Sequence, residues 1–221
     1  MAGEPESLDR DESLARRRHR HWYDRLIMLS DGVFAISMTL LALDIRAPAA
    51  GRLEDLWAAL APQLDAYTLS FLVISVYWLA HRRFMAMILT VDAPITVVNL
   101  VMLGLVGLLP AATRLAHASG PLPSHMLIYG ALVVAIAIAL AVLWGYAALA
   151  PGRVSPEVGL AERWFLFALI LIAPPLFLVI TSVLRGPPPG TVPLLLAALF
   201  LVGWRMRQWV TRRLARPAAA P

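Results

Sequence analysis

The apolar residues of the chain fall into six blocks of about twenty residues, separated by short polar or Pro/Gly-rich connections. A helix of that length crosses the roughly 30 Å hydrocarbon core of a bilayer. The blocks do not alternate polar with apolar residues, as the strands of a membrane-spanning barrel do. The pattern therefore predicts an all-α polytopic membrane protein with six transmembrane helices, near residues 23–45, 60–81, 93–114, 125–149, 160–184 and 191–209.

The segments outside these blocks are short. Residues 1–20 are charged and have little to bury, a composition typical of disorder. We therefore expect a disordered segment over residues 1–20, one transmembrane domain over 21–210 and a tail over 211–221. Asp92 and Ser124 precede the third and fourth blocks, where each side chain is suited to cap a helix.

The distribution of arginine predicts the orientation. With six spans, both termini share one side with the second and fourth connections, and this side holds fifteen of the nineteen arginines. The other side holds only Arg46, Arg52, Arg114 and Arg185. Because cytoplasmic loops carry an excess of arginine, we expect a multi-pass protein of the cell membrane with both termini in the cytoplasm.

The composition indicates a protein that is embedded in the lipid bilayer and does not bind nucleic acid. The chain is 60% hydrophobic with a mean hydropathy of +0.72, above the usage of water-soluble domains. Its net charge of +5 comes from arginines that flank apolar blocks, so no separate basic domain is left to bind a nucleic acid. Without cysteine there is neither a disulfide framework nor a thiolate metal site.

Enzymatic chemistry finds no support in the sequence. Hydrolysis within a membrane needs a nucleophile–base set or a metal site. The five histidines are scattered and lack an H-E-x-x-H spacing. We expect no catalytic residues, no bound metal and no cofactor.

The first block has two faces when it is drawn as a helix. Successive residues are about 100° apart, so Ile36, Leu40 and Leu43 fall on one narrow stripe. Ser30 and Asp31 point more than about 100° away from Ile36. An acid within a span costs about 2.5–3.5 kcal/mol on insertion scales and is usually paired and inward-facing. Two readings stay open: Asp31 is either a wet residue near the interface or a functional one, and the aliphatic stripe lines either a bundle contact or a pore.

Three polar residues of the next two blocks lie at a similar depth. They are Trp78, His81 and Asn99. An indole, imidazole or amide N–H is a suitable donor to a carboxylate or hydroxyl, and in lipid each needs a partner. The alternatives are an interfacial anchor for Trp78 and a loop position for His81 beside an arginine pair.

The residues of three segments now resemble the transmembrane protein 175 family of prokaryotic and lysosomal potassium channels. The first helix reads Arg25-x-x-x-Leu29-Ser30-Asp31, close to the family hallmark R-x-x-x-F-S-D. Two further segments agree, 77–84 and 99–110. The departure is Leu29, which stands where the family has phenylalanine.

This resemblance implies a homotetramer around a pore lined by the first helix. Carried over residue by residue, it implies a narrowest ring at Ile36, further apolar layers at Leu40 and Leu43, and hydroxyl groups from Thr39 near the constriction. It also implies an inter-helix network that positions the first helix. The network residues are Arg25, Ser30, Asp31, Trp78, His81 and Asn99.

The expected function is a potassium-permeable, leak-like cation channel. The sequence has no T-V-G-Y-G carbonyl filter, so selectivity must arise differently. A narrow apolar collar gates by dewetting and forces ions to shed water, which favours potassium modestly over sodium. The alternative is a secondary transporter of a small cation or a proton-coupled substrate, which typically has internal repeats and broken helices with polar groups at midplane.

Overall fold

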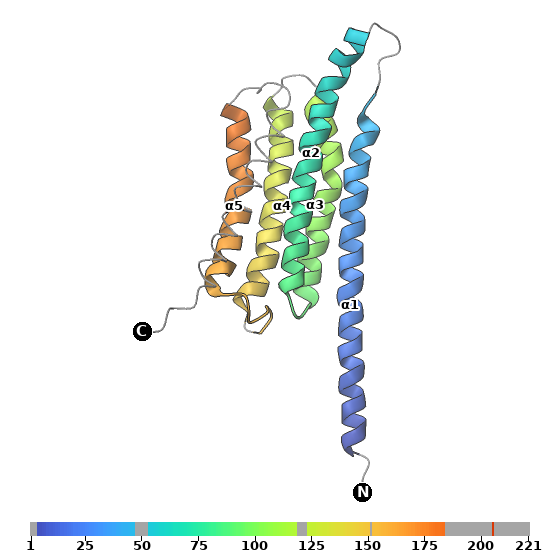
Figure 1. Ribbon diagram of the computed structural model, residues 1–221, viewed down its shortest axis with the longest axis vertical. Helices are drawn as coiled ribbons and strands as arrows, with labels where there is room; N and C mark the ends of the chain where they lie inside the picture. Colours follow the sequence, from blue (N-terminus) through green and yellow to red (C-terminus); the bar gives the residue numbers. More distant parts are fainter. Residues whose placement is uncertain (1–3, 47–52, 119–122, 151, 184–204, 206–221) are drawn as a thin grey trace, which may run out of the picture.

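A computed structural model describes residues 4–46, 53–118, 123–150, 152–183 and 205. These residues form helices and short connections, so the predicted all-α class is confirmed. The helices are α1 (Glu4–Leu40), which continues as the 3-10 helix η1 (Leu41–Asp44), α2 (Leu53–Met87), α3 (Ala93–Ala118), α4 (Pro123–Leu149) and α5 (Leu160–Val183). Consecutive helices run in opposite directions side by side (Figure 1). The sixth predicted helix, 191–209, and the tail 211–221 lie outside the described residues.

Four stretches of the described residues are long and apolar enough to cross a membrane. They are His21–Asp44, Asp55–Met87, Ala93–Ala116 and Leu127–Leu149. α2 extends beyond the predicted 60–81 at both ends. α4 begins at Pro123, so Ser124 lies in its first turn and not in front of it as predicted.

The start of α1 corrects the sequence prediction. Residues 4–20 are helical and run into the first membrane helix without interruption, so disorder was the wrong expectation for them. Glutamate, leucine, alanine and arginine are good helix formers, and no glycine or proline occurs between Glu6 and Asp31. The costly step of helix formation is its nucleus, which the membrane helix already supplies. A polar composition therefore did not prevent the helix from extending.

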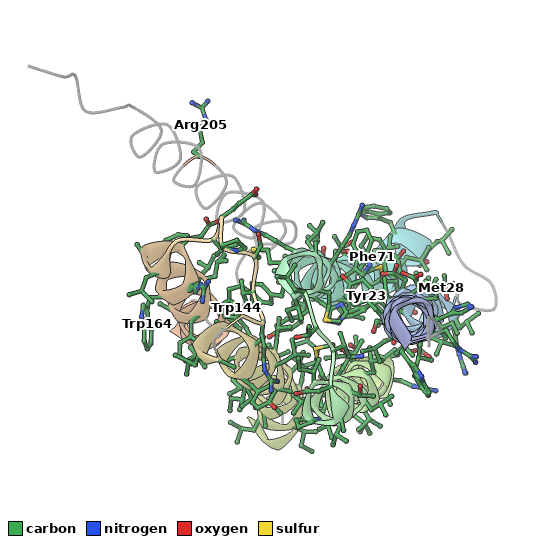
Figure 2. The ribbon with its side chains drawn as sticks, turned by 90° about the horizontal axis from the view of Figure 1, so that it is seen from below. Tyr23, Met28, Phe71, Trp144, Trp164 and Arg205 are labelled. Carbon is green, nitrogen blue, oxygen red and sulfur yellow. The ribbon has the colours of Figure 1, made fainter. Side chains whose placement is uncertain are left out.

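The core lies between α3 and α4, and α1, α2 and α5 pack around it. Fully buried apolar residues recur at helical spacing on α3 and α4. They are Ile95, Met102, Val106 and Leu109 on α3, and Ile136, Leu140 and Leu143 on α4. Trp144 lies inside the bundle and stacks on Phe84 of α2 at 4.7 Å, whereas Trp164 of α5 projects away from it (Figure 2).

The connection between α4 and α5 packs against the connection between α2 and α3. The Leu89 N–H donates to the Arg153 carbonyl at 2.8 Å, and the Ser155 N–H donates to the Met87 carbonyl at 3.0 Å. Gly152 has φ +74°, a left-handed conformation that favours glycine and turns the chain into this pairing. The pairing ties the two connections together at the same end of the bundle.

Asp92 is the polar centre of this end. One carboxylate oxygen accepts from the Ile95 N–H at 3.1 Å, which confirms the predicted cap of α3. The other accepts from the Tyr146 hydroxyl at 2.8 Å and from the Arg153 guanidinium. Burial alone would raise the pKa of Asp92, but these three donors outweigh it and hold the pKa below its usual value.

Asp92→Ala should lower the stability by about 1–2 kcal/mol, because it removes a helix cap and an ion pair. The melting temperature of the protein in detergent should fall by about 2–8 °C. Asp92→Asn keeps a capping oxygen and should lose less than half of that. Because the folded pKa of Asp92 is depressed, its ionic contribution is complete above the unfolded value near 3.9 and fades as the pH falls further. A wild-type advantage over Asp92→Asn that persisted unchanged well below pH 4 would contradict this account.

Candidate functional site

The aliphatic stripe of α1 stays on the surface of the single chain. Ile36, Leu40 and Leu43 are 59%, 41% and 73% exposed. Thr39 is exposed on the same side, and its hydroxyl donates to the Ile36 carbonyl at 2.9 Å. The opposite side of α1 is buried, with Phe34 fully enclosed. The helix therefore presents one unpartnered apolar face and packs the other against its own bundle.

A buried chain of hydrogen bonds joins α1, α3 and α2. The Ser30 hydroxyl donates to the Leu26 carbonyl at 2.8 Å and accepts from the Asn99 amide nitrogen at 3.0 Å. The Asn99 amide oxygen lies 2.8 Å from His81 Nε2. Ser30 and Asn99 have no exposed surface, and His81 has almost none. These side chains lock the buried face of α1 to its neighbours.

The donor and acceptor roles in this series of hydrogen bonds determine which ring nitrogen of His81 carries a hydrogen. A serine hydroxyl has one hydrogen, and that of Ser30 points to a backbone carbonyl. Asn99 must therefore turn its NH₂ group to Ser30 and its oxygen to His81. Since this oxygen only accepts, the Nε2 atom of His81 carries a hydrogen and donates it.

Asp31 makes the second attachment of α1. Its carboxylate accepts from the Trp78 indole N–H at 2.8 Å, and the Arg82 guanidinium lies 5.5 Å from the centre of the Trp78 ring. The Tyr23 hydroxyl donates to the Met85 carbonyl at 2.7 Å and holds α1 to α2 about two turns nearer the N-terminus of α1. Figure 2 shows Tyr23 between these two helices.

An open crevice lies beside this attachment, between α1 and α2. Its volume is about 550 Å³. It is lined by Tyr23, Asp24, Ile27, Met28, Asp31, His81, Arg82 and Ala86. The Asp31 carboxylate thus remains reachable from outside the chain while one of its oxygens is held by Trp78.

Five of the six predicted network residues come together, and Arg25 does not. Arg25 is exposed and makes no hydrogen bond or ion pair with the part of the chain that the structure describes. The helix explains this, because five residues separate it from Ser30 and turn it about 140° away. The prediction that Arg25 belongs to the network is therefore corrected. Within one chain, Arg25 lies on the exposed face of α1.

A second buried polar cluster had not been predicted. The Ser70 hydroxyl lies 2.8 Å from that of Thr113 and 3.3 Å from that of Tyr129, which joins α2, α3 and α4. The Tyr77 hydroxyl donates to the Val133 carbonyl at 2.8 Å. Hydroxyl groups inside apolar blocks were the available signal, since in lipid they seek partners on other helices.

Comparisons with known proteins cover the part of the chain that holds this site. The family of the endosomal/lysosomal potassium channel TMEM175 matches residues 25–110, which contain the whole network. A potassium channel of Streptomyces collinus is 37% identical over 127 residues, which are 54% of this chain and 62% of that protein. A potassium channel of Chamaesiphon minutus is 32% identical over 136 residues, 57% of this chain and 66% of that protein.

More distant relatives and a solved structure agree with this match. The human endosomal/lysosomal proton channel TMEM175 is 25% identical over 138 residues, 61% of this chain and 27% of that protein. The crystal structure of a lysosomal potassium-selective channel TMEM175 homolog from Chamaesiphon minutus has a TM-score of 0.62 and 29% identity, covering 82% of this chain and 97% of that one. The sequence matches span less than two thirds of each of these relatives.

Proposed function

We propose, from the match of the TMEM175 family to residues 25–110, that the chain is a potassium-permeable, leak-like channel of the cell membrane. It conducts ions and does not catalyse a reaction. It functions as a homotetramer with both termini in the cytoplasm, and α1 of each subunit lines the central ion path. The permeant ion is potassium, and no cofactor takes part.

The observation that carries this proposal is the division of α1 into two faces. One face is fixed to α2 and α3 through Ser30 and Asp31. The other is apolar, exposed and unpartnered in the single chain. A fourfold arrangement that turns this face to a common axis supplies the missing contact and builds a pathway in the same step.

The constriction of this pathway is an apolar collar of four Ile36 side chains. Leu40 and Leu43 add apolar layers toward the outside, and Thr39 brings its oxygen close to the collar. Such a collar closes by dewetting, and an ion crosses it only after losing part of its water. Potassium loses water more readily than sodium, which gives a modest preference.

Purified protein in planar bilayers under opposed potassium and sodium gradients tests the proposal. We expect unitary current steps, a reversal potential displaced toward that of potassium, and measurable sodium permeation. Saturable flux coupled to a second solute, without unitary steps, would identify a secondary transporter and overturn the channel assignment.

Asp31→Ala should change gating more than permeation, since Asp31 holds α1 to Trp78 from outside the ion path. We expect the open probability to change about tenfold, equivalent to about 1.4 kcal/mol, the size of one charge-assisted hydrogen bond. The unitary conductance and the potassium-to-sodium permeability ratio should stay within about twofold of wild type. Single-channel recording separates the two quantities, and Trp78→Phe, which removes the N–H donor and keeps an aromatic ring, should reproduce the gating effect. A changed permeability ratio in both variants would contradict the role.

A further inference from the structure

Within the span His21–Asp44, Arg25 is the one charged residue on the apolar face of α1 that the network leaves aside. It lies near the inner end of the span His21–Asp44, and no described residue pairs with it. Arginines within spans usually face the bundle interior or a water-filled cavity. The interior of its own bundle is excluded, because Arg25 is exposed.

The helix places Arg25 on the same line as the proposed collar. Eleven residues separate Arg25 from Ile36, which leaves the two side chains only about 20° apart around α1. Leu29, 48% exposed, lies about 20° to the other side of Ile36 and about 10.5 Å further inward along the helix. Gly32 lies between them, and a Cβ added there meets no atom within 4 Å, so this part of the face is open as well.

Neighbouring carboxylates of the same chain do not compensate this charge. Asp24 precedes Arg25 and is turned about 100° around the helix, to the crevice between α1 and α2. Asp31 lies about 120° away and is bound to Trp78. Whatever lies in front of the apolar face therefore meets a guanidinium that no described residue binds.

We propose that the ion path continues inward from Ile36 past Leu29 to a ring of four Arg25 side chains, which makes the channel rectify inward. This inference rests on the proposed function and adds a charged inner mouth to it. A positive ring repels potassium entering from the cytoplasm more than potassium that arrives from outside through the collar. A potential of one kT at the mouth lowers the local concentration of a monovalent cation about threefold.

Recordings in planar bilayers with equal potassium chloride on both sides test this proposal. At about 0.1 M salt, where charges are screened over roughly 10 Å, the wild type should pass less outward than inward current. Arg25→Gln should raise the outward-to-inward ratio about threefold, as expected for the loss of a one-kT barrier. Arg25→Lys should keep the wild-type ratio. Arg83→Gln, which removes the same charge near the same end of the bundle, where Arg83 pairs with Glu162 of α5, should leave the ratio unchanged.

The absence of cysteine allows a sharper test on channels that have already assembled. In Arg25→Cys channels, a cationic thiol reagent applied from the inner side should restore rectification, and an anionic reagent should reverse it. In Arg83→Cys channels neither reagent should alter the ratio. If the variants yield no current, the wild type still decides, because its rectification should fade near 1 M salt, where screening acts within about 3 Å.

The outcomes separate this inference from the proposed function. A potassium current whose outward-to-inward ratio depends neither on the charge at residue 25 nor on the salt concentration overturns the ring. That result means that Arg25 reaches lipid headgroups instead. A wild-type protein without unitary potassium current overturns the channel itself.

Discussion

Ile36→Asn should raise the potassium current of reconstituted protein by about tenfold and largely remove its preference for potassium over sodium, which corresponds to a barrier lowered by about 1.4 kcal/mol. The reason is hydration. An apolar collar offers an ion nothing in place of the water it sheds, whereas an amide oxygen replaces part of that shell. Dewetting of the collar is also weakened, because an amide keeps water in place. Unitary conductance and the reversal potential under opposed gradients measure both effects.

Two matched variants give this prediction its control. Ile36→Leu keeps an apolar side chain of equal volume and should leave selectivity close to wild type. Ala35→Asn introduces the same amide at nearly the same depth but about 100° around α1. It should alter neither conductance nor selectivity. The opposite pattern, an unaffected Ile36→Asn and a leaky Ala35→Asn, would turn a different face of α1 to the ion path.

The helices were predictable because their signals are local. Apolar blocks of span length define α2, α3, α4 and α5 within a few residues at most ends. The cap by Asp92 follows from one side chain and the turn after it. The N-terminal extension of α1 was missed, because composition reports what a segment can bury and not whether a neighbouring helix already supplies its nucleus.

The polar network was predictable in its members but not in its pairing. Ser30, Asn99 and His81 share a depth in the membrane and complementary donors and acceptors, which identify them as a set. Which atom meets which depends on the packing of α1 against α3. The position of Arg25 was available in the sequence, since its rotation about α1 opposes that of Ser30. The family pattern grouped the two, and the helix geometry separates them.

Contacts between distant segments could not be predicted from the sequence. Asp92 meets Tyr146 and Arg153 only because the connection before α3 packs on the last turn of α4 and on the connection after it. Ser70 and Thr113 meet because α2 and α3 cross at a particular register. Neither relation leaves a periodic or spacing signal within one segment.

Asn99→Leu should be among the most destabilising single substitutions in the membrane region. It removes the acceptor of His81 and the donor to Ser30 in one step, and it leaves a buried N–H without a partner. A buried donor left unpaired costs about 1–3 kcal/mol, and hydrogen bonds between membrane helices contribute in the lower part of that range. We expect a loss of about 2 kcal/mol and a fall of about 4–8 °C in the melting temperature in detergent. Val97→Leu, at an exposed position on the same helix, should change it little.

Non-additivity distinguishes this network from simple loss of packing at Asn99. Once Asn99 is leucine, Ser30 has already lost its donor, so adding Ser30→Ala should cost much less than Ser30→Ala alone. His81→Leu added to Asn99→Leu should recover stability, because replacing both partners by apolar groups leaves no donor unpaired. The coupling between Asn99 and His81 should amount to about 1 kcal/mol or more. Strictly additive losses across the three positions would mean that the hydrogen bonds do not hold α1 in place, and that apolar packing alone orients its exposed face.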